Sequence, residues 1–214
     1  MSNVFKECNK LKEIKGLENF DTSKVEDMSS LFESCSEIII LDLSSFDTSK
    51  VKNMKLMFSG CNKLEEIIGL YNFNTVKVTN MFGLFQSCLE IEYLDLSNFS
   101  TSNVVDMMLM FSHCSKLKQI DGINNFNTNK VENMSGMFQL CTELEYLDLS
   151  NFNTSKVNKM SEMFNQCNKM RYLNLNNFII INCKTNLMFS FENKKNCLFI
   201  TNNENLLKLY NSSE

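Results

Sequence analysis

Several residue types are absent or scarce in this chain of 214 residues, and each scarcity excludes a class of structure or chemistry. There is no proline, tryptophan or alanine, and there is one arginine and one histidine. The single histidine, His113, excludes a metal site built from several histidines, and a histidine-dependent catalytic relay would have to use it. No apolar run approaches the roughly 18 residues of a membrane span. The first residues also lack the charged-then-apolar order of a signal peptide.

The charge balance is mild. The formal net charge is −4, from 21 basic and 25 acidic residues. This is too small and too mixed in sign to predict nucleic acid or an anionic membrane as a partner. Hydrophobic residues make up 43% of the chain, with 18 phenylalanines and 14 methionines, so we expect a packed core rather than disorder.

One sequence unit recurs along most of the chain. A cysteine returns at alternating spacings of 27 and 26 residues, a phenylalanine stands three residues before each cysteine, and a methionine stands four residues before that phenylalanine. The cysteines are Cys8, Cys35, Cys61, Cys88, Cys114, Cys141 and Cys167. A fixed period of this length is the signature of a stacked repeat architecture.

Two versions of the unit alternate. One carries a glycine at Gly16, Gly69 or Gly122, and has one residue more between its cysteine and the next phenylalanine. The other carries an aspartate in Leu-Asp-Leu-Ser, at Asp42, Asp95 or Asp148. Members of each version lie 53 residues apart, so the array has the form of a duplicated pair of repeats.

Each unit combines two hydrophobic periodicities. Val25, Met28, Leu31, Phe32 and Cys35 follow the spacing of one helix face, and Ser23 with Glu26 has the form of a capping box. Leu94-Asp95-Leu96 alternates apolar and polar residues as a short strand does. We therefore predict an α/β solenoid of about seven helix–strand repeats, with a parallel sheet on one face.

The repeated residues resemble a known family. Residues 134–160 follow Met-Ser-x-Met-Phe-x-x-Cys-x-x-Leu-x-x-Leu-Asp-Leu-Ser-x-Phe-x-Thr-Ser-x-Val-x-x-Met almost throughout, which resembles the BspA-like leucine-rich repeats of bacterial surface proteins and mycoplasma-type lipoproteins. The resemblance covers about residues 1–178. It implies a leucine-rich-repeat-like, right-handed solenoid, a surface-associated adhesion or host-interaction function, and a location at the cell surface or outside the cell.

Both ends depart from the repeat. Residues 1–5 align with residues 134–138, so the array starts in the middle of a unit. We expect either a fragment of a larger repeat protein or a protein that is not exported by the usual route. Residues 179–214 lose the register and are expected to form a degenerate repeat or cap, with residues 211–214 as a frayed tail.

The cysteine column has two interpretations. Stacked cysteines one rung apart come close enough for a disulfide, but each also continues the apolar stripe of its repeat. We favour small buried thiols that fill the core. Cys183 and Cys197 lie off the column, and no Cys-x-x-Cys pair indicates zinc.

The strand face is the predicted site. With the leucines of each strand pointing inward, a row of polar and tyrosine residues points outward: Asp42, Tyr93, Asp95, Tyr146, Asp148, Tyr172 and Asn174. Exposed aromatic residues with polar neighbours are common where proteins bind each other. The competing interpretation is that each aspartate hydrogen-bonds the backbone of the adjacent turn. Aspartates of one type lie about 10 Å apart, too far to share a calcium ion.

The function predicted from these residues is binding without catalysis. We expect no cofactor and no metal, because no phosphate-binding loop, nucleophile elbow or carboxylate pair at a recognisable spacing is present. The partner is expected to be a protein or another macromolecule. The alternative to a surface adhesin is a cytoplasmic scaffold for protein–protein interactions, in which the thiols stay reduced.

Overall fold

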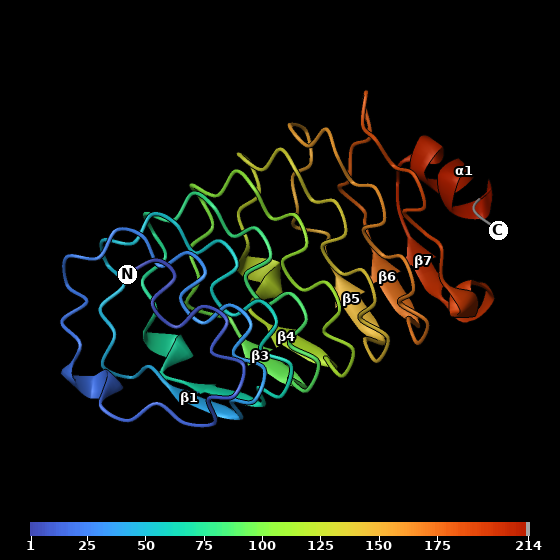
Figure 1. Ribbon diagram of the computed structural model, residues 1–214. Helices are drawn as coiled ribbons and strands as arrows, with labels where there is room; N and C mark the ends of the chain where they lie inside the picture. Colours follow the sequence, from blue (N-terminus) through green and yellow to red (C-terminus); the bar gives the residue numbers. More distant parts are fainter. Residues whose placement is uncertain (213–214) are drawn as a thin grey trace.

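The chain winds into a β-solenoid of about six turns, seen in a computed structural model that describes residues 1–212 (Figure 1). A column of parallel bridges joins equivalent residues of successive turns: Asp27, Asn53, Asn80, Asp106, Asn133, Lys159 and Lys184. The predicted stacking of repeats into a solenoid is therefore correct. The predicted count of about seven units is not supported, and no strand forms at residues 13–15 of the first unit.

Short parallel strands line one side of the solenoid, as predicted. They are β1 (Ile40–Asp42), β2 (Glu66–Ile68), β3 (Tyr93–Asp95), β4 (Gln119–Asp121), β5 (Tyr146–Asp148), β6 (Tyr172–Asn174) and β7 (Leu198–Ile200). The strands do not form one sheet. β1 pairs with β2, β3 pairs with β4, and β5, β6 and β7 form a three-stranded sheet.

The predicted helices are wrong. Residues 22–35 and their equivalents form successive turns, not α-helices. The backbone N–H groups bond alternately within one turn and to the next turn. The Leu31 N–H donates to Met28 O in the same turn at 3.3 Å. The Phe32 N–H donates to Met57 O in the next turn at 2.9 Å. The predicted capping box is absent, because Ser23 Oγ donates to Asp21 Oδ1 and Glu26 pairs with Lys52.

Left-handed residues separate these turns. Ser30 and Ser34 have φ values of 55° and 62°, and most equivalent positions, four residues apart in each unit, also have positive φ. A left-handed residue ends a right-handed helix. Stacked four-residue turns and an α-helix both place apolar residues three and four apart, which is why the sequence pattern fits either structure.

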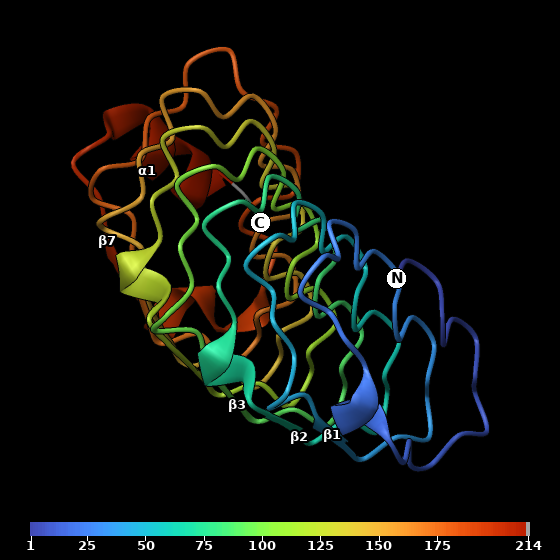
Figure 2. The ribbon, with the colours of Figure 1, turned by 90° about the vertical axis from the view of Figure 1, so that its left-hand side faces the viewer.

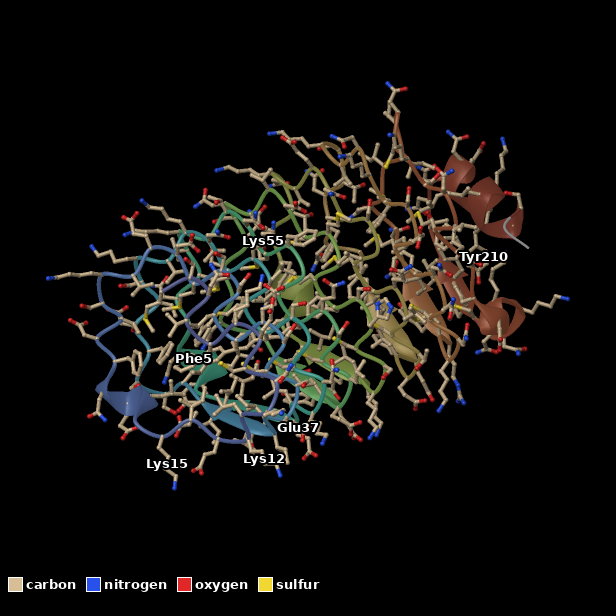
Figure 3. All side chains as sticks on the ribbon, in the orientation of Figure 1. Phe5, Lys12, Lys15, Glu37, Lys55 and Tyr210 are labelled. Carbon is tan, nitrogen blue, oxygen red and sulfur yellow. The ribbon has the colours of Figure 1, made fainter. Side chains whose placement is uncertain are left out.

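Side-chain columns fill the interior. Phe5, Phe32, Phe58, Phe85, Phe111, Phe138, Phe164 and Phe189 stack in that order, with ring centroids 5.5–5.9 Å apart. Phe5 lies toward the N-terminal end of this column, and Tyr210 covers its C-terminal end (Figure 3).

A column of buried threonines connects the turns by hydrogen bonds. Thr48 Oγ1 donates to Asn74 O at 3.1 Å and accepts the Asn74 N–H at 2.7 Å. The same donor bond to the next turn is made by Thr22, Thr75, Thr101, Thr128 and Thr154. Each hydroxyl can therefore be buried without an unsatisfied polar atom.

The glycine-type units break the sheet. Gly69 and Gly122 begin the 3₁₀ helices η2 (Leu70–Asn72) and η3 (Ile123–Asn125), as Gly16 begins η1 (Leu17–Asn19). At Gly69 an added Cβ would lie 2.5 Å from Ser44 Cα, so this unit packs closely against the turn before it. Strand pairing is lost after each glycine-type unit, between β2 and β3 and between β4 and β5. Figure 2 shows these short helices recurring beside the strands.

The C-terminal segment closes the solenoid. The 3₁₀ helix η4 (Glu192–Asn196) leads into β7, and α1 (Glu204–Ser212) lies across the last turn (Figure 1). Asn203 caps α1 by accepting the N–H of Leu206, and Leu206 and Tyr210 are buried. Of the predicted frayed tail, residues 211 and 212 are the last two residues of α1, and residues 213 and 214 lie outside the described part.

Candidate interaction face

The strands present two parallel rows of outward side chains. The middle residue of most strands is buried, whereas the first and third face solvent or are partly exposed. Register within each sheet, together with the equivalence of the repeats across the two gaps, places the first residues in one row: Ile40, Glu66, Tyr93, Gln119, Tyr146, Tyr172 and Leu198. The third residues form the second row: Asp42, Ile68, Asp95, Asp121, Asp148, Asn174 and Ile200. All seven residues of the predicted site lie in these rows.

Only two of the three tyrosines of the predicted site are neighbours in the first row. Tyr146 and Tyr172 stack with ring centroids 4.3 Å apart. Tyr93 is separated from Tyr146 by the Gln119 position. Its hydroxyl donates to Asp121 Oδ2 at 2.7 Å, a bond that contributes most to raising the Tyr93 pKa to about 12. The exposed fractions of Tyr93 and Tyr146 are 49% and 60%, so both rings remain accessible.

The aspartates of the predicted site also accept hydrogen bonds from backbone N–H groups two residues after them, where the chain leaves each strand. Asp42 Oδ1 accepts from Ser44 Oγ and N–H, and these bonds lower the pKa of its carboxyl group. Asp95 and Asp148 accept the N–H two residues on, as Asn174 does. Burial alone would raise the Asp148 pKa, but its hydrogen bonds outweigh burial and lower it. The competing structural interpretation thus describes these contacts, and Asp148 Oδ2 in addition accepts a hydrogen bond from Asn174 Nδ2 at 3.2 Å.

Ion pairs flank the strands in a regular pattern. A glutamate of one turn pairs with a basic residue of the next in Glu37–Lys63, Glu90–Lys116, Glu92–Lys118, Glu143–Lys169 and Glu145–Arg171. Every one of these pairs joins turns whose strands are also paired. In the described residues, no such pair crosses the gap between β2 and β3 or between β4 and β5.

Each gap is a cleft on the strand face. The cleft between β2 and β3 has a volume of about 630 Å³, and the cleft between β4 and β5 one of about 560 Å³. Nine residues of the first have equivalents 53 positions later in the second. Glu65, Glu66, Ile67, Leu70, Tyr71, Ile91, Tyr93, Leu94 and Asp95 correspond to Lys118, Gln119, Ile120, Ile123, Asn124, Leu144, Tyr146, Leu147 and Asp148. Sequence reasoning missed both clefts, although the extra residue of the glycine-type unit marks where each one opens.

The remaining chemistry-bearing residues serve packing. Cys114 Sγ donates to Phe85 O in the preceding turn at 3.1 Å, and Cys35, Cys61, Cys88, Cys141 and Cys167 make the equivalent bond. Burial raises the pKa values of these thiols. His113 occupies a left-handed turn position and its Nδ1 bonds Ser112 Oγ, not Cys114. Within residues 1–212, no three His, Cys, Asp or Glu side chains are grouped to hold a metal ion.

Comparison with known proteins places the chain in a family. The model of the family described as "Mycoplasma protein of unknown function, DUF285" matches residues 1–120 and again residues 79–202. The chain belongs to this family. The two matches overlap, as expected when one model fits an array of similar units at two registers. No curated protein matches the chain.

The helices of this DUF285 member are all short. Over residues 1–212, none of them combines the length and the apolar character that crossing a bilayer requires.

Proposed function

We propose that this protein is a non-enzymatic repeat protein that binds a macromolecular partner through the face formed by β1–β7. The observation that carries the proposal is the row of exposed apolar and aromatic side chains on that face. Ile40, Tyr93, Tyr146 and Leu198 have exposed fractions of 49–60% and occupy equivalent strand positions. Large apolar side chains repeated on one face are typical of protein-binding surfaces.

The resemblance to BspA-like repeats supports a specific form of this proposal. In that form, the protein is a surface-associated adhesion or host-interaction protein whose partner is a protein or another macromolecule. The alternative is an intracellular scaffold. It is favoured by the six buried thiols of the column, because each of them is used as an S–H donor and oxidation would remove that bond.

A triple substitution tests the binding face. The variant combines Tyr93→Ser, Tyr146→Ser and Tyr172→Ser, which removes the aromatic rings of the outward row and leaves every core residue unchanged. We therefore expect the fold to persist and partner capture to be lost. The matched control is Val76→Ser with Val105→Ser, which removes exposed apolar side chains that lie outside strands β1–β7. Capture is measured by affinity pull-down from the source organism with mass spectrometry, then by titration of the purified partner. Equal capture by both variants and the parent protein would reject the proposed face.

Protease treatment of intact source cells separates the two forms of the proposal. Peptides of this chain released before lysis support the adhesin. Peptides recovered only after lysis support the intracellular scaffold.

A further inference from the structure

The cleft between β2 and β3 exposes strand edges on both of its sides. Glu66 donates its N–H to Ile39 O, and Ile68 O accepts from Leu43, so these two residues of β2 bond toward β1. Because backbone groups alternate between the two edges of a strand, the N–H and C=O of Ile67 point toward β3. In the same way, Glu92 O and Leu96 N–H bond toward β4, which leaves the backbone of Tyr93 and Asp95 pointing toward β2.

These edges have no partner across the cleft. Within residues 1–212, no strand pairing or backbone hydrogen bond joins β2 to β3, although β1, β2 and β3 follow one another on the same side (Figure 2). Unpaired strand edges accept an added extended segment through main-chain hydrogen bonds. The volume of about 630 Å³ is that of a few residues of chain.

Most of the charged side chains that line this cleft are acidic. Glu65, Glu66, Glu90, Glu92 and Asp95 line it, against the single cation Lys116. Lys116 already pairs with Glu90, and Glu92 pairs with Lys118. Glu65 and Glu66 are exposed and take part in no ion pair in the described part of the chain. The rings of Tyr71 and Tyr93 are also exposed, and aromatic faces attract cations.

We propose that the β2–β3 cleft binds an extended, basic peptide segment of the partner by strand addition, with its lysine or arginine side chains against Glu65 and Glu66. This inference rests on the proposed binding function of the strand face and identifies the chemistry of the partner. The main chain of the peptide bonds Ile67, Tyr93 and Asp95, and its alternate side chains face the carboxylates.

The second cleft supplies a matched control within the same molecule. Lys118 and Gln119 occupy the positions of Glu65 and Glu66. The β4–β5 cleft therefore has the same open edges and is lined by Asp121 and Asp148, but it lacks carboxylates at these two positions. We expect it not to select a basic segment.

The test uses an acetylated, amidated Lys-Val-Lys-Val-Lys peptide and isothermal titration of the full chain. We expect one site per chain. Glu65→Lys with Glu66→Gln, which gives the first cleft the residues of the second, weakens binding at least tenfold. The reverse exchange, Lys118→Glu with Gln119→Glu, raises the stoichiometry from one to two. All four positions are exposed, and circular dichroism confirms that each variant is folded.

Two further peptides separate strand addition from simple ionic attraction. Glu-Val-Glu-Val-Glu should not bind, and an N-methylated Lys-Val-Lys-Val-Lys, which keeps the charges but loses backbone donors, should bind at least tenfold more weakly. Absence of binding by the basic peptide, equal binding to the Glu65→Lys/Glu66→Gln variant, or equal binding of the N-methylated peptide would each overturn the inference. The proposed function fails separately, when the triple tyrosine variant keeps its capture of the partner.

Discussion

The phenylalanine column shows how a single residue type links one turn to the next. Phe138 has no exposed surface and lies between Phe111 and Phe164, at centroid distances of 5.5 and 5.9 Å. Each ring therefore contributes to two turn-to-turn interfaces, and the stability of a repeat array is close to the sum of such interfaces.

Removing one ring should be costly. We expect Phe138→Ala to lower the free energy of unfolding by about 3–5 kcal/mol, the usual range for a buried phenylalanine. Phe20, which is 37% exposed, is the control, and Phe20→Ala should cost less than about 2 kcal/mol. Urea denaturation followed by circular dichroism measures both. A Phe138→Ala cost no larger than that of the control would contradict the burial of the Phe138 ring between its two neighbours.

Because its thiols are buried, the cysteine column should lower the free energy of unfolding at alkaline pH. Burial raises the pKa of Cys114 and Cys167 from about 9 to about 12. An unfolded thiol releases its proton near pH 9, whereas the folded thiol keeps it. The contribution of these thiols to the free energy of unfolding is therefore fully present below pH 9 and is lost as pH rises from 9 toward 12. Each such thiol contributes a slope of up to about 1.4 kcal/mol per pH unit.

Urea midpoints at pH 7, 8, 9 and 10, in the presence of a reductant, test this dependence. A Cys88→Ala/Cys114→Ala variant is the control, because it lacks two of the titrating groups. Its decline above pH 9 should be shallower than that of the parent protein. Parallel pH curves for the two proteins would show that the thiols do not cause the decline.

At the scale of elements, the turns show what sequence reasoning can and cannot recover. The repeat unit, the inward columns and the approximate places of the strands follow from spacing alone, although β3 begins and ends one residue before the predicted strand Leu94-Asp95-Leu96. The helices did not form, because the N–H groups of Phe32 and its equivalents bond the neighbouring turn. A local pattern records which residues face inward, but it does not record whether the backbone bonds within a turn or between turns.

The same limit applies to the candidate site. The outward positions of Asp42, Tyr93 and Asp148 follow from strand alternation, whereas the clefts depend on where strands fail to pair. Each gap follows a unit in which Gly69 or Gly122 packs closely against the preceding turn, and that packing is a contact between residues distant in the sequence. The 27-residue units were visible in the sequence, but their effect on sheet pairing was not.

Substitution of the glycines tests the close packing at Gly69. Gly16 and Gly69 have φ values of 87° and 85°, so alanine at either position should cost about 1–2 kcal/mol in backbone strain. At Gly69 the added Cβ also meets the Ser44 backbone at 2.5 Å, whereas at Gly16 the nearest atom lies 3.6 Å away. We expect Gly69→Ala to cost about 2–5 kcal/mol in total, because overpacking adds to strain. Thermal and urea unfolding measure the free energy of unfolding of both variants. Equal losses for the two variants would show that the contact with Ser44 adds nothing to the backbone strain.

At the scale of the whole molecule, the solenoid must protect the open edge of its last turn. β7 pairs with β6 on one side, and the segment after it folds back as α1. Tyr210 packs against Phe189, Phe191 and Phe199, and its hydroxyl donates to Lys194 O. The open apolar end of a repeat array invites association with another chain, and Tyr210 of α1 covers the end of the phenylalanine column at Phe189.

Two adjacent leucines of α1 provide a matched test of the cap. Leu206 is fully buried, whereas Leu207 is 45% exposed. Leu206→Asp places a charge in the interface and should release α1 from the last turn, because an unpaired buried charge is costly. Leu207→Asp changes the helix composition equally and should leave α1 docked. We expect the first variant alone to self-associate in light scattering, and to lose hydrogen-exchange protection in β7 while β1–β4 stay protected. Because each turn contacts only its neighbours, loss of protection throughout the molecule would instead show that the cap stabilises the whole solenoid as one cooperative unit.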